Sequence, residues 1–237
     1  MEIYRSIGIA DAVRTAGADL APSMGIFRGS DLSSVISPQK RVEGGGSKKQ
    51  DFQALKWFEG ASPTAGARGT QDCVEPVLVR EARERGGDLR FYTECVGFEQ
   101  DGEGVSITLR DRESGKEETV KADYMIAADG ANSLVRRQLG VKCTPDRPLG
   151  NLLNILFHAD LKELVRGREF SLCLIERPEQ RGVITSINNK DRWVYHLSYD
   201  PAKGEKPEDY PPERCVDLLH LALGMPDVKI EIKSILP

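Results

Sequence analysis

The pattern of apolar and polar positions predicts two helices in the first third of the chain. Residues 2–16 place apolar side chains at helical spacing and precede Gly17, which predicts one amphipathic helix with a glycine cap. A second helix is predicted to begin with Asp72 as its N-cap, because Glu75 stands three residues later and apolar residues follow at helical spacing. The Gly86–Gly87 pair is expected to end this helix.

The stretch between these helices, residues 18–70, is rich in glycine, serine and proline and shows little periodicity. It is predicted to be a long loop region, in which 26–27 and 54–58 are the pieces expected to be ordered because they carry bulky apolar groups. The three glycines at 44–46 follow no apolar strand and are interpreted as a flexible linker.

The pattern after the second helix indicates short strands, followed by one continuous apolar run. Turn signals separate three alternating segments, and these predict a small antiparallel meander over residues 89–98, 104–110 and 117–120. Residues 124–128 are apolar without interruption and end in Asp129-Gly130, which predicts a strand buried on both faces of a parallel sheet. A short helix capped near Ser133 and ended by Gly140 is expected next.

From residue 150 onward alternation dominates, and a mostly antiparallel sheet is predicted. The expected strands cover residues 151–159, 170–176, 182–187, 192–199 and 228–236. One helix interrupts them, between about Asp209 and Gly224. The Pro145–Pro148 link separates the two patterns, so the sequence predicts a two-layered α/β chain with domains at 1–149 and 150–237.

Composition and charge exclude several classes of protein. The 237 residues carry 33 Lys and Arg against 37 Asp and Glu, so the net charge of −4 provides no basic face for nucleic acid. No apolar window of membrane-spanning length and no signal peptide occur, and a cytoplasmic location with no membrane partner is expected. The five cysteines and three histidines lack ligand spacings, so no metal site is predicted.

The Asp129-Gly130 pair is the first candidate for chemistry. A carboxylate at the end of a strand can accept hydrogen bonds from ribose hydroxyls, and the glycine lets a ligand approach the backbone. The amides that open the helix after Asn132 could face a diphosphate. The alternative is a simple Asp-Gly turn that joins a strand to a helix, and spacing does not decide between the two.

Several stretches of the chain resemble a known family. These are Gln71 to Pro76, Arg90 to Thr93, Phe98 to Asp101 and, above all, the Ala-Ala-Asp-Gly-Ala-Asn-Ser-Leu-Val-Arg run at 127–136. They are similar to the FAD-dependent aromatic hydroxylases, which are flavoprotein monooxygenases of the para-hydroxybenzoate hydroxylase type, and most of all to the branch acting on phenols and polyketides. The resemblance implies a partial FAD/NAD(P)-binding flavoprotein fold with an antiparallel substrate-binding sheet.

The resemblance also implies roles for individual residues. Asp129 and Gly130 fall on a fingerprint that contacts the ribose and diphosphate side of FAD and is implicated in NAD(P)H binding. Gln71 matches a glutamine that reaches the flavin, and Val96 falls where a backbone amide and carbonyl pair with adenine. Structural roles alone, at a helix start for Gln71 and within a strand for Val96, are the alternative.

The implied reaction is hydroxylation of a phenolic or polyketide substrate with FAD and NAD(P)H, through a flavin C4a-hydroperoxide, and no catalytic side chain is identified. In the family the substrate lies between the flavin and the sheet, so the strand at 192–199 offers candidates on both faces. Trp193 and Tyr195 share one face and His196 lies on the other. The aromatic pair is also typical of ordinary core.

Two features of the family are missing from this sequence. No Gly-x-Gly-x-x-Gly turn follows a strand, and no later Gly-Asp motif occurs, so the chain is expected to be the middle of such an enzyme. One alternative is a related flavin enzyme such as a halogenase, epoxidase or reductase. Another is a truncated, catalytically inactive module that binds an aromatic ligand or a partner protein. A sheet edge left without its partner strands predicts self-association.

Overall fold

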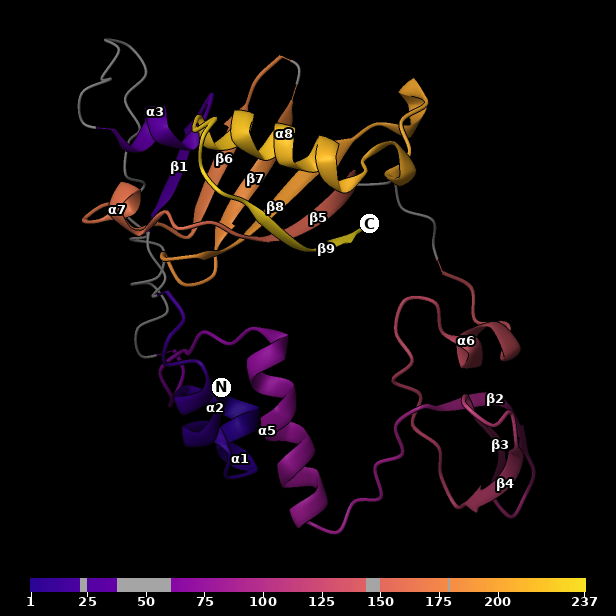
Figure 1. Ribbon diagram of the computed structural model, residues 1–237. Helices are drawn as coiled ribbons and strands as arrows, with labels where there is room; N and C mark the ends of the chain where they lie inside the picture. Colours follow the sequence, from indigo (N-terminus) through magenta and orange to yellow (C-terminus); the bar gives the residue numbers. More distant parts are fainter. Residues whose placement is uncertain (22–24, 38–60, 144–149, 179) are drawn as a thin grey trace. The chain divides into compact units, whose positions relative to one another are not determined.

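The computed structural model describes residues 1–21, 25–37, 61–143, 150–178 and 180–237. The chain forms two compact units, one made of Met1–Glu81 with Pro148–Pro237 and the other of Ala82–Arg147 (Figure 1). The segment 54–58, one of the two pieces predicted to be ordered, and the glycines at 44–46 lie outside the described residues. Among the described residues, no helix combines the length and the apolar content needed to cross a lipid bilayer.

A six-stranded sheet is the centre of the first unit (Figure 1). Its strands stand in the order β1-β6-β7-β8-β5-β9. They are β1 (Ile26–Gly29), β5 (Asn151–His158), β6 (Leu172–Glu176), β7 (Arg181–Ser186), β8 (Arg192–Tyr199) and β9 (Glu231–Leu236). Every neighbouring pair is antiparallel except β1 with β6. The mostly antiparallel sheet predicted after residue 150 is therefore confirmed.

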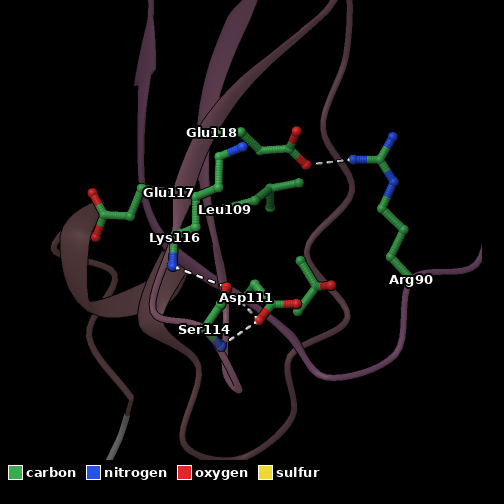
Figure 2. A pocket seen from close by; sticks show the side chains of 8 residues that line it. Arg90, Leu109, Asp111, Ser114, Lys116, Glu117 and Glu118 are labelled. Atoms are coloured by element: carbon green, nitrogen blue, oxygen red, sulfur yellow. Dashed lines mark hydrogen bonds and ion pairs between the residues drawn. The ribbon is translucent and has the colours of Figure 1, made fainter.

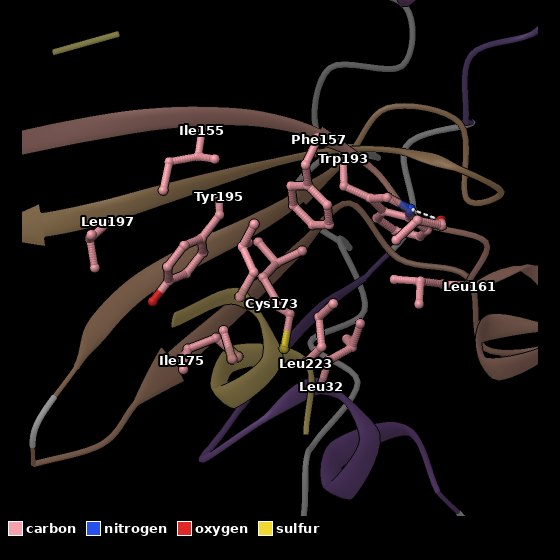
Figure 3. Close-up of a cluster of buried hydrophobic side chains, with 14 of the residues drawn as sticks. Leu32, Ile155, Phe157, Leu161, Cys173, Ile175, Trp193, Tyr195, Leu197 and Leu223 are labelled. Atoms are coloured by element: carbon pink, nitrogen blue, oxygen red, sulfur yellow. Dashed lines mark hydrogen bonds between the residues drawn. The ribbon is translucent and has the colours of Figure 1, made fainter. Parts of the chain in front are cut away.

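One face of this sheet forms the main hydrophobic core. Alternate residues of the central strands are buried there beneath helices α8 (Pro212–Leu223) and α3 (Leu32–Ile36), with α7 (Lys162–Val165) contributing Val165 (Figure 3). The indole of Trp193 stacks on Phe170 with ring centroids 5.8 Å apart, and its Nε1 donates a hydrogen bond of 2.9 Å to the carbonyl oxygen of Ala159. Burial of this alternating set fixes the register of the strands.

Helix α8 follows two short 3-10 turns, η2 (Pro201–Lys203) and η3 (Pro207–Asp209), and confirms the helix predicted between Asp209 and Gly224. Gly224 ends it in the left-handed conformation, with φ of +68°. A β-carbon there would stand 2.3 Å from the carboxylate of Asp31, so glycine is needed both for the backbone and for the close approach of α3.

Helix α3 was not predicted from the sequence. It is only five residues long, and its N-cap Asp31 accepts hydrogen bonds from the backbone N–H and the hydroxyl of Ser34. The strand β1 just before it confirms the prediction that residues 26–27 are ordered. Both elements pack against the core of the six-stranded sheet rather than lying in a loop.

The N-terminal segment forms two helices, α1 (Glu2–Ser6) and α2 (Ala10–Ala16), where one helix over 2–16 was predicted. Gly8 interrupts them with φ of +81°, a value that the right-handed helix cannot include. The break also leaves Ile3 76% exposed, whereas Val13 packs with Ile9 and Val77 in a second small core. The third helix there, α5 (Gln71–Glu84), begins one residue before Asp72, which lies in its first turn instead of capping it.

The second unit contains the predicted meander, made of β2 (Thr93–Gln100), β3 (Val105–Asp111) and β4 (Glu117–Ala122). Helix α6 (Leu134–Gln138) follows, and its N-cap Ser133 accepts a hydrogen bond from the backbone N–H of Arg136, as the sequence predicted. The three strands pair antiparallel in chain order.

The prediction of a buried strand at 124–128 is wrong. The segment adopts no strand, and Tyr124 and Ile126 are 89% and 92% exposed. A strand in a parallel sheet needs backbone partners on neighbouring strands. In the described part of the chain no strand pairs with this segment, so its apolar side chains have no sheet to join.

Candidate functional site

The second face of the six-stranded sheet, opposite α8, is the candidate binding surface and is called the open face here. Its side chains are half-buried or exposed, and the pairing register arranges them in rows across the strands. Apolar side chains occupy much of its two central rows: Ile26, Leu156, Leu172 and Val194 in one row, and Leu174 and Val183 in the other. A sheet face of this kind can accept a flat apolar ligand over several strands.

Three polar side chains stand next to one another within these two rows. Asn154 on β5 and His196 on β8 are directly opposite each other in the register, and Thr185 on β7 lies diagonally beside His196. The Nδ1 atom of His196 is 2.7 Å from Oδ1 of Asn154, and its Nε2 atom is 3.0 Å from Oγ1 of Thr185. These three residues, the polar triad, form one hydrogen-bonded chain across three strands.

The ring of His196 is held in its neutral form. Burial lowers the pKa of His196 below its ordinary value, because the charged form loses hydration in the half-buried setting. Since Oδ1 of Asn154 can only accept, Nδ1 carries the proton, and the neutral ring leaves Nε2 to accept from the hydroxyl of Thr185. Both ring nitrogens are therefore used within the triad.

A pH prediction follows from this depressed pKa. The unfolded chain, with an ordinary histidine near pKa 6.5, binds a proton before the folded chain does, so the contribution of His196 to stability is present above about pH 6.5 and is lost as the pH falls. We expect the free energy of unfolding, measured by urea denaturation, to fall less steeply between about pH 7 and 5 in a His196→Gln variant than in the wild type. Equal slopes would contradict a depressed pKa.

Trp193 and Tyr195, which the sequence nominated together with His196, lie on the opposite face. Both are fully buried in the core beneath α8, as Figure 3 shows. The hydroxyl of Tyr195 accepts a hydrogen bond of 2.8 Å from Nε2 of Gln180, and burial raises the pKa of Tyr195, so the phenol stays protonated. The sequence predicted that these two residues alternate with His196. Because both are buried, His196 is the one of the three candidate substrate residues that faces away from the core.

The start of helix α5 is tied to one end of the open face. The guanidinium of Arg192, on β8, lies 2.7 Å from the carboxylate of Asp72, and hydrogen bonds from Thr70 and Arg192 lower the pKa of Asp72. Gln71, the residue that resembles the flavin-contacting glutamine, is the exposed neighbour of Asp72 at the first position of the helix. This ion pair links the first turn of α5, which carries Gln71, to strand β8.

Val96 lies at a β-bulge in the second unit. The register passes from Cys95 opposite Leu109 to Gly97 opposite Thr108, so Val96 is the extra residue. An extra residue in a bulge is left out of the ladder, and its backbone N–H and C=O are then available to another partner. The geometry suits a backbone that pairs with a heterocycle, the role that the resemblance implies for this position.

Asp129 and Gly130 lie in the exposed turn that precedes α6. Hydrogen bonds from the hydroxyl of Ser133 and the N–H of Val135 lower the pKa of Asp129, so its carboxylate is ionised at neutral pH. Gly130 has φ of +73°, and its carbonyl oxygen accepts from the N–H of Ser133. The carboxylate is exposed to solvent, but the buried strand expected before it is absent.

The β2-β3-β4 meander carries a separate pocket of about 400 Å³ (Figure 2). Ion pairs link its charged side chains, since Arg90 lies 2.7 Å from both Asp88 and Glu118. Asp111 in turn accepts hydrogen bonds from the backbone and hydroxyl of Ser114. Most of the charged groups that line this pocket are therefore engaged with one another, and we do not assign a ligand to it.

The cysteines and the other residue types that bind metals are scattered over the described part of the chain. No group of three or more His, Cys, Asp and Glu side chains there is placed to hold a metal ion. The five cysteines are free, and burial raises the pKa of Cys173 to about 12, which keeps that thiol protonated.

Asn154 and Thr185 were not nominated from the sequence. Asn154 could have been noticed as the one polar residue among the apolar positions 152–157. Nothing in the sequence around Thr185 marks it as a site residue, because it lies beside His196 only through the pairing of β7 with β8.

Comparisons with known proteins identify the family to which the chain is similar. A family model described as "FAD binding domain" matches residues 1–236. Aklavinone 12-hydroxylase of Streptomyces peucetius subsp. caesius is 34% identical over 99% of this chain. Tetracenomycin A2 monooxygenase-dioxygenase of Streptomyces glaucescens is 36% identical over 74% of it. The crystal structure of an aklavinone-11 hydroxylase in a ternary complex with FAD and aklavinone superposes with a TM-score of 0.81 at 31% identity, over 99% of this chain.

The chain spans less than half the length of these proteins, with shares of 47% and 33% for the two relatives and 43% for the solved structure. The family model nevertheless covers nearly every residue, and the mixed α/β architecture with its antiparallel sheets is that of the solved flavoprotein. The chain therefore belongs to the family described as the FAD binding domain.

Proposed function

We propose that this chain is part of an FAD- and NAD(P)H-dependent monooxygenase that hydroxylates a phenolic or polyketide substrate. The observation that carries the proposal is the family match over residues 1–236, joined to an apolar open face with one polar triad. In this proposal residues 1–149 serve mainly the cofactor and 150–237 the substrate. The strand β1 and helix α3 are the exception, because they belong to the substrate sheet by their packing.

The residues proposed to hold the cofactor are compatible with its chemistry. The ionised carboxylate of Asp129 would accept hydrogen bonds from ribose hydroxyls, and Gly130 leaves the backbone open to the diphosphate side. The bulge frees the backbone of Val96 for adenine, and Gln71 would donate its side-chain amide to the flavin. When bound and reduced by NAD(P)H, the flavin supplies the activation of dioxygen.

The substrate is proposed to lie on the open face. Apolar side chains there would exclude water from the ring system and orient it parallel to the sheet. His196, as a member of the polar triad, would hold the polar edge of the site, while the buried rings of Trp193 and Tyr195 would support the strand from the core side. In this proposal the side chains of the open face position the substrate, and none of them acts as a nucleophile.

The cofactor half of the proposal is tested by flavin uptake. We expect the 237-residue chain to bind FAD, measured by the change in flavin absorbance between about 350 and 500 nm. An Asp129→Asn variant should bind about tenfold more weakly, because a charge-assisted hydrogen bond is lost. Asp123→Asn is the matched control, since this exposed carboxylate lies close in sequence and outside the motif.

Phenol-dependent oxidation of NAD(P)H in the presence of FAD would support the hydroxylase activity. A chain that binds an aromatic compound but takes up no flavin would contradict the proposed function and favour a binding module. Equal affinities of the Asp129→Asn variant and the wild type would contradict only the role of that carboxylate.

A further inference from the structure

Asn154 presents a donor that no other group in the described part of the chain uses. Its Oδ1 accepts from Nδ1 of His196, whereas its Nδ2 has no partner there and is not among the buried polar atoms that lack one. The side chain is half-buried, so Nδ2 and its two N–H groups reach the open face.

The other two members of the polar triad hold this amide in one orientation. His196 cannot turn toward a ligand without giving up its bond to Asn154 or its bond to Thr185, because both ring nitrogens are engaged. In the structure the carbonyl end of the Asn154 amide faces Nδ1 of His196, so Nδ1 donates to Oδ1 and this bond holds the amide in that orientation. The amino end must therefore face outward, between the side chains of the neighbouring strands.

Apolar side chains flank this donor in its own row and in one neighbouring row, while Ser198 stands diagonally beside it in the row on the other side. In its row across the sheet stand Val183 and Leu174 beyond His196, and Leu236 on the other side. The next row contains Leu156, Val194 and Leu172 with Thr185 among them. A ligand that covers this surface removes water from the N–H groups of Asn154, and a donor left without an acceptor then opposes binding.

We propose that Asn154 is the specificity-determining donor of the open face and selects planar fused-ring aromatics that carry a carbonyl or phenolate oxygen, with His196 and Thr185 as its positioning residues. The inference rests on the proposed function, which assigns the open face to the substrate. It adds that Asn154 binds the polar edge of the ring system, and that this edge must carry a hydrogen-bond acceptor. His196, with both nitrogens occupied, acts through Asn154 and does not touch the ligand oxygen.

A pair of ligands that differ only in the acceptor oxygen tests the proposal. Anthraquinone-2-sulfonate carries two ring carbonyls, and anthracene-2-sulfonate has the same fused rings and charge without them. We expect the wild-type chain to bind the quinone about tenfold more tightly in calorimetric titration, which corresponds to about one hydrogen bond. Asn154→Leu should abolish this preference and leave the affinity for the anthracene unchanged or higher.

Three variants separate the donor from its supports and from general effects on folding. Asn154→Asp has the same shape but presents an acceptor, and we expect it to bind the quinone more weakly than the anthracene. His196→Leu should reduce the preference, because the amide is then free to turn. Ser198→Ala, an exposed residue on β8 that shares the open face, is the matched control and should keep the full preference.

The outcomes distinguish the inference from the proposed function. A preference for the quinone that survives in both Asn154 variants would overturn the inference and leave the open face as the substrate surface. If the wild type binds neither ligand, the substrate assignment of that face fails, and the inference fails with it. Because the result is a ratio of two affinities, a partly unfolded variant lowers both and leaves the ratio unchanged.

Discussion

Replacing Trp193 with alanine is expected to lower the free energy of unfolding by about 3–5 kcal/mol, the range for truncating a large core aromatic. The indole is fully buried, stacks on Phe170 and donates a 2.9 Å hydrogen bond to the carbonyl oxygen of Ala159. Truncation leaves a cavity under the sheet and a buried carbonyl without its donor. Urea denaturation followed by circular dichroism measures the loss directly.

The variant also decides between the two roles that the sequence allowed for Trp193. Val194→Ala is the control, because Val194 is the next residue on the same strand, lies on the open face and is only half-buried. We expect that variant to lose roughly 1 kcal/mol or less, as is usual for a partly exposed truncation. A Trp193→Ala chain with unchanged stability but weaker binding of an aromatic ligand would place the indole in the substrate site and contradict its role in the core.

The strands after residue 150 could be predicted from the sequence because each has one buried and one less buried face. In β8, for example, Trp193, Tyr195 and Leu197 alternate with Val194 and His196, and the core selects one set. This contrast is local and survives in any short window of sequence. Helix α6 was predictable for a similar reason, since Ser133 caps it with its own side chain.

The polar triad was only partly predictable. The alternation of β8 identified His196 as a candidate. Its partners Asn154 and Thr185, however, are 42 and 11 residues away in the sequence and lie on other strands. Their meeting depends on the register of β5, β7 and β8, which is set by core packing across the whole sheet. A polar residue such as Asn154 within an apolar strand marks a special position without naming its partner.

The run from Tyr124 to Ala128 was misinterpreted for a related reason. Its apolar composition is that of a strand covered on both faces, but composition does not supply the neighbouring strands that would cover it. Asp129 therefore has neither the preceding strand nor the burial that the pattern predicted, and the family assignment rests on the match over residues 1–236 instead. The single helix predicted over residues 2–16 failed at one position, because the positive φ of Gly8 breaks the helix although the apolar spacing continues through it.

The exposed run also predicts the behaviour of the isolated chain in solution. Tyr124 and Ile126 are 89% and 92% exposed, and in the described part of the chain residues 124–128 make no backbone hydrogen bond. Unpaired backbone groups beside large apolar side chains are a template for pairing with a second copy. We therefore expect the wild-type chain to elute from a size-exclusion column as an oligomer, with a monomer share that falls as concentration rises.

A lysine at position 126 should reverse this association, because burying its charge between two paired segments is costly and natural sheet edges are protected in the same way. The Ile126→Lys variant is expected to elute mainly as a monomer at concentrations where the wild type associates. Leu221→Lys is the matched control, since Leu221 is 43% exposed but stands on helix α8, where the backbone groups are already paired. A wild-type chain that stays monomeric, or a control that dissociates equally well, would show that the 124–128 segment is not the associating surface.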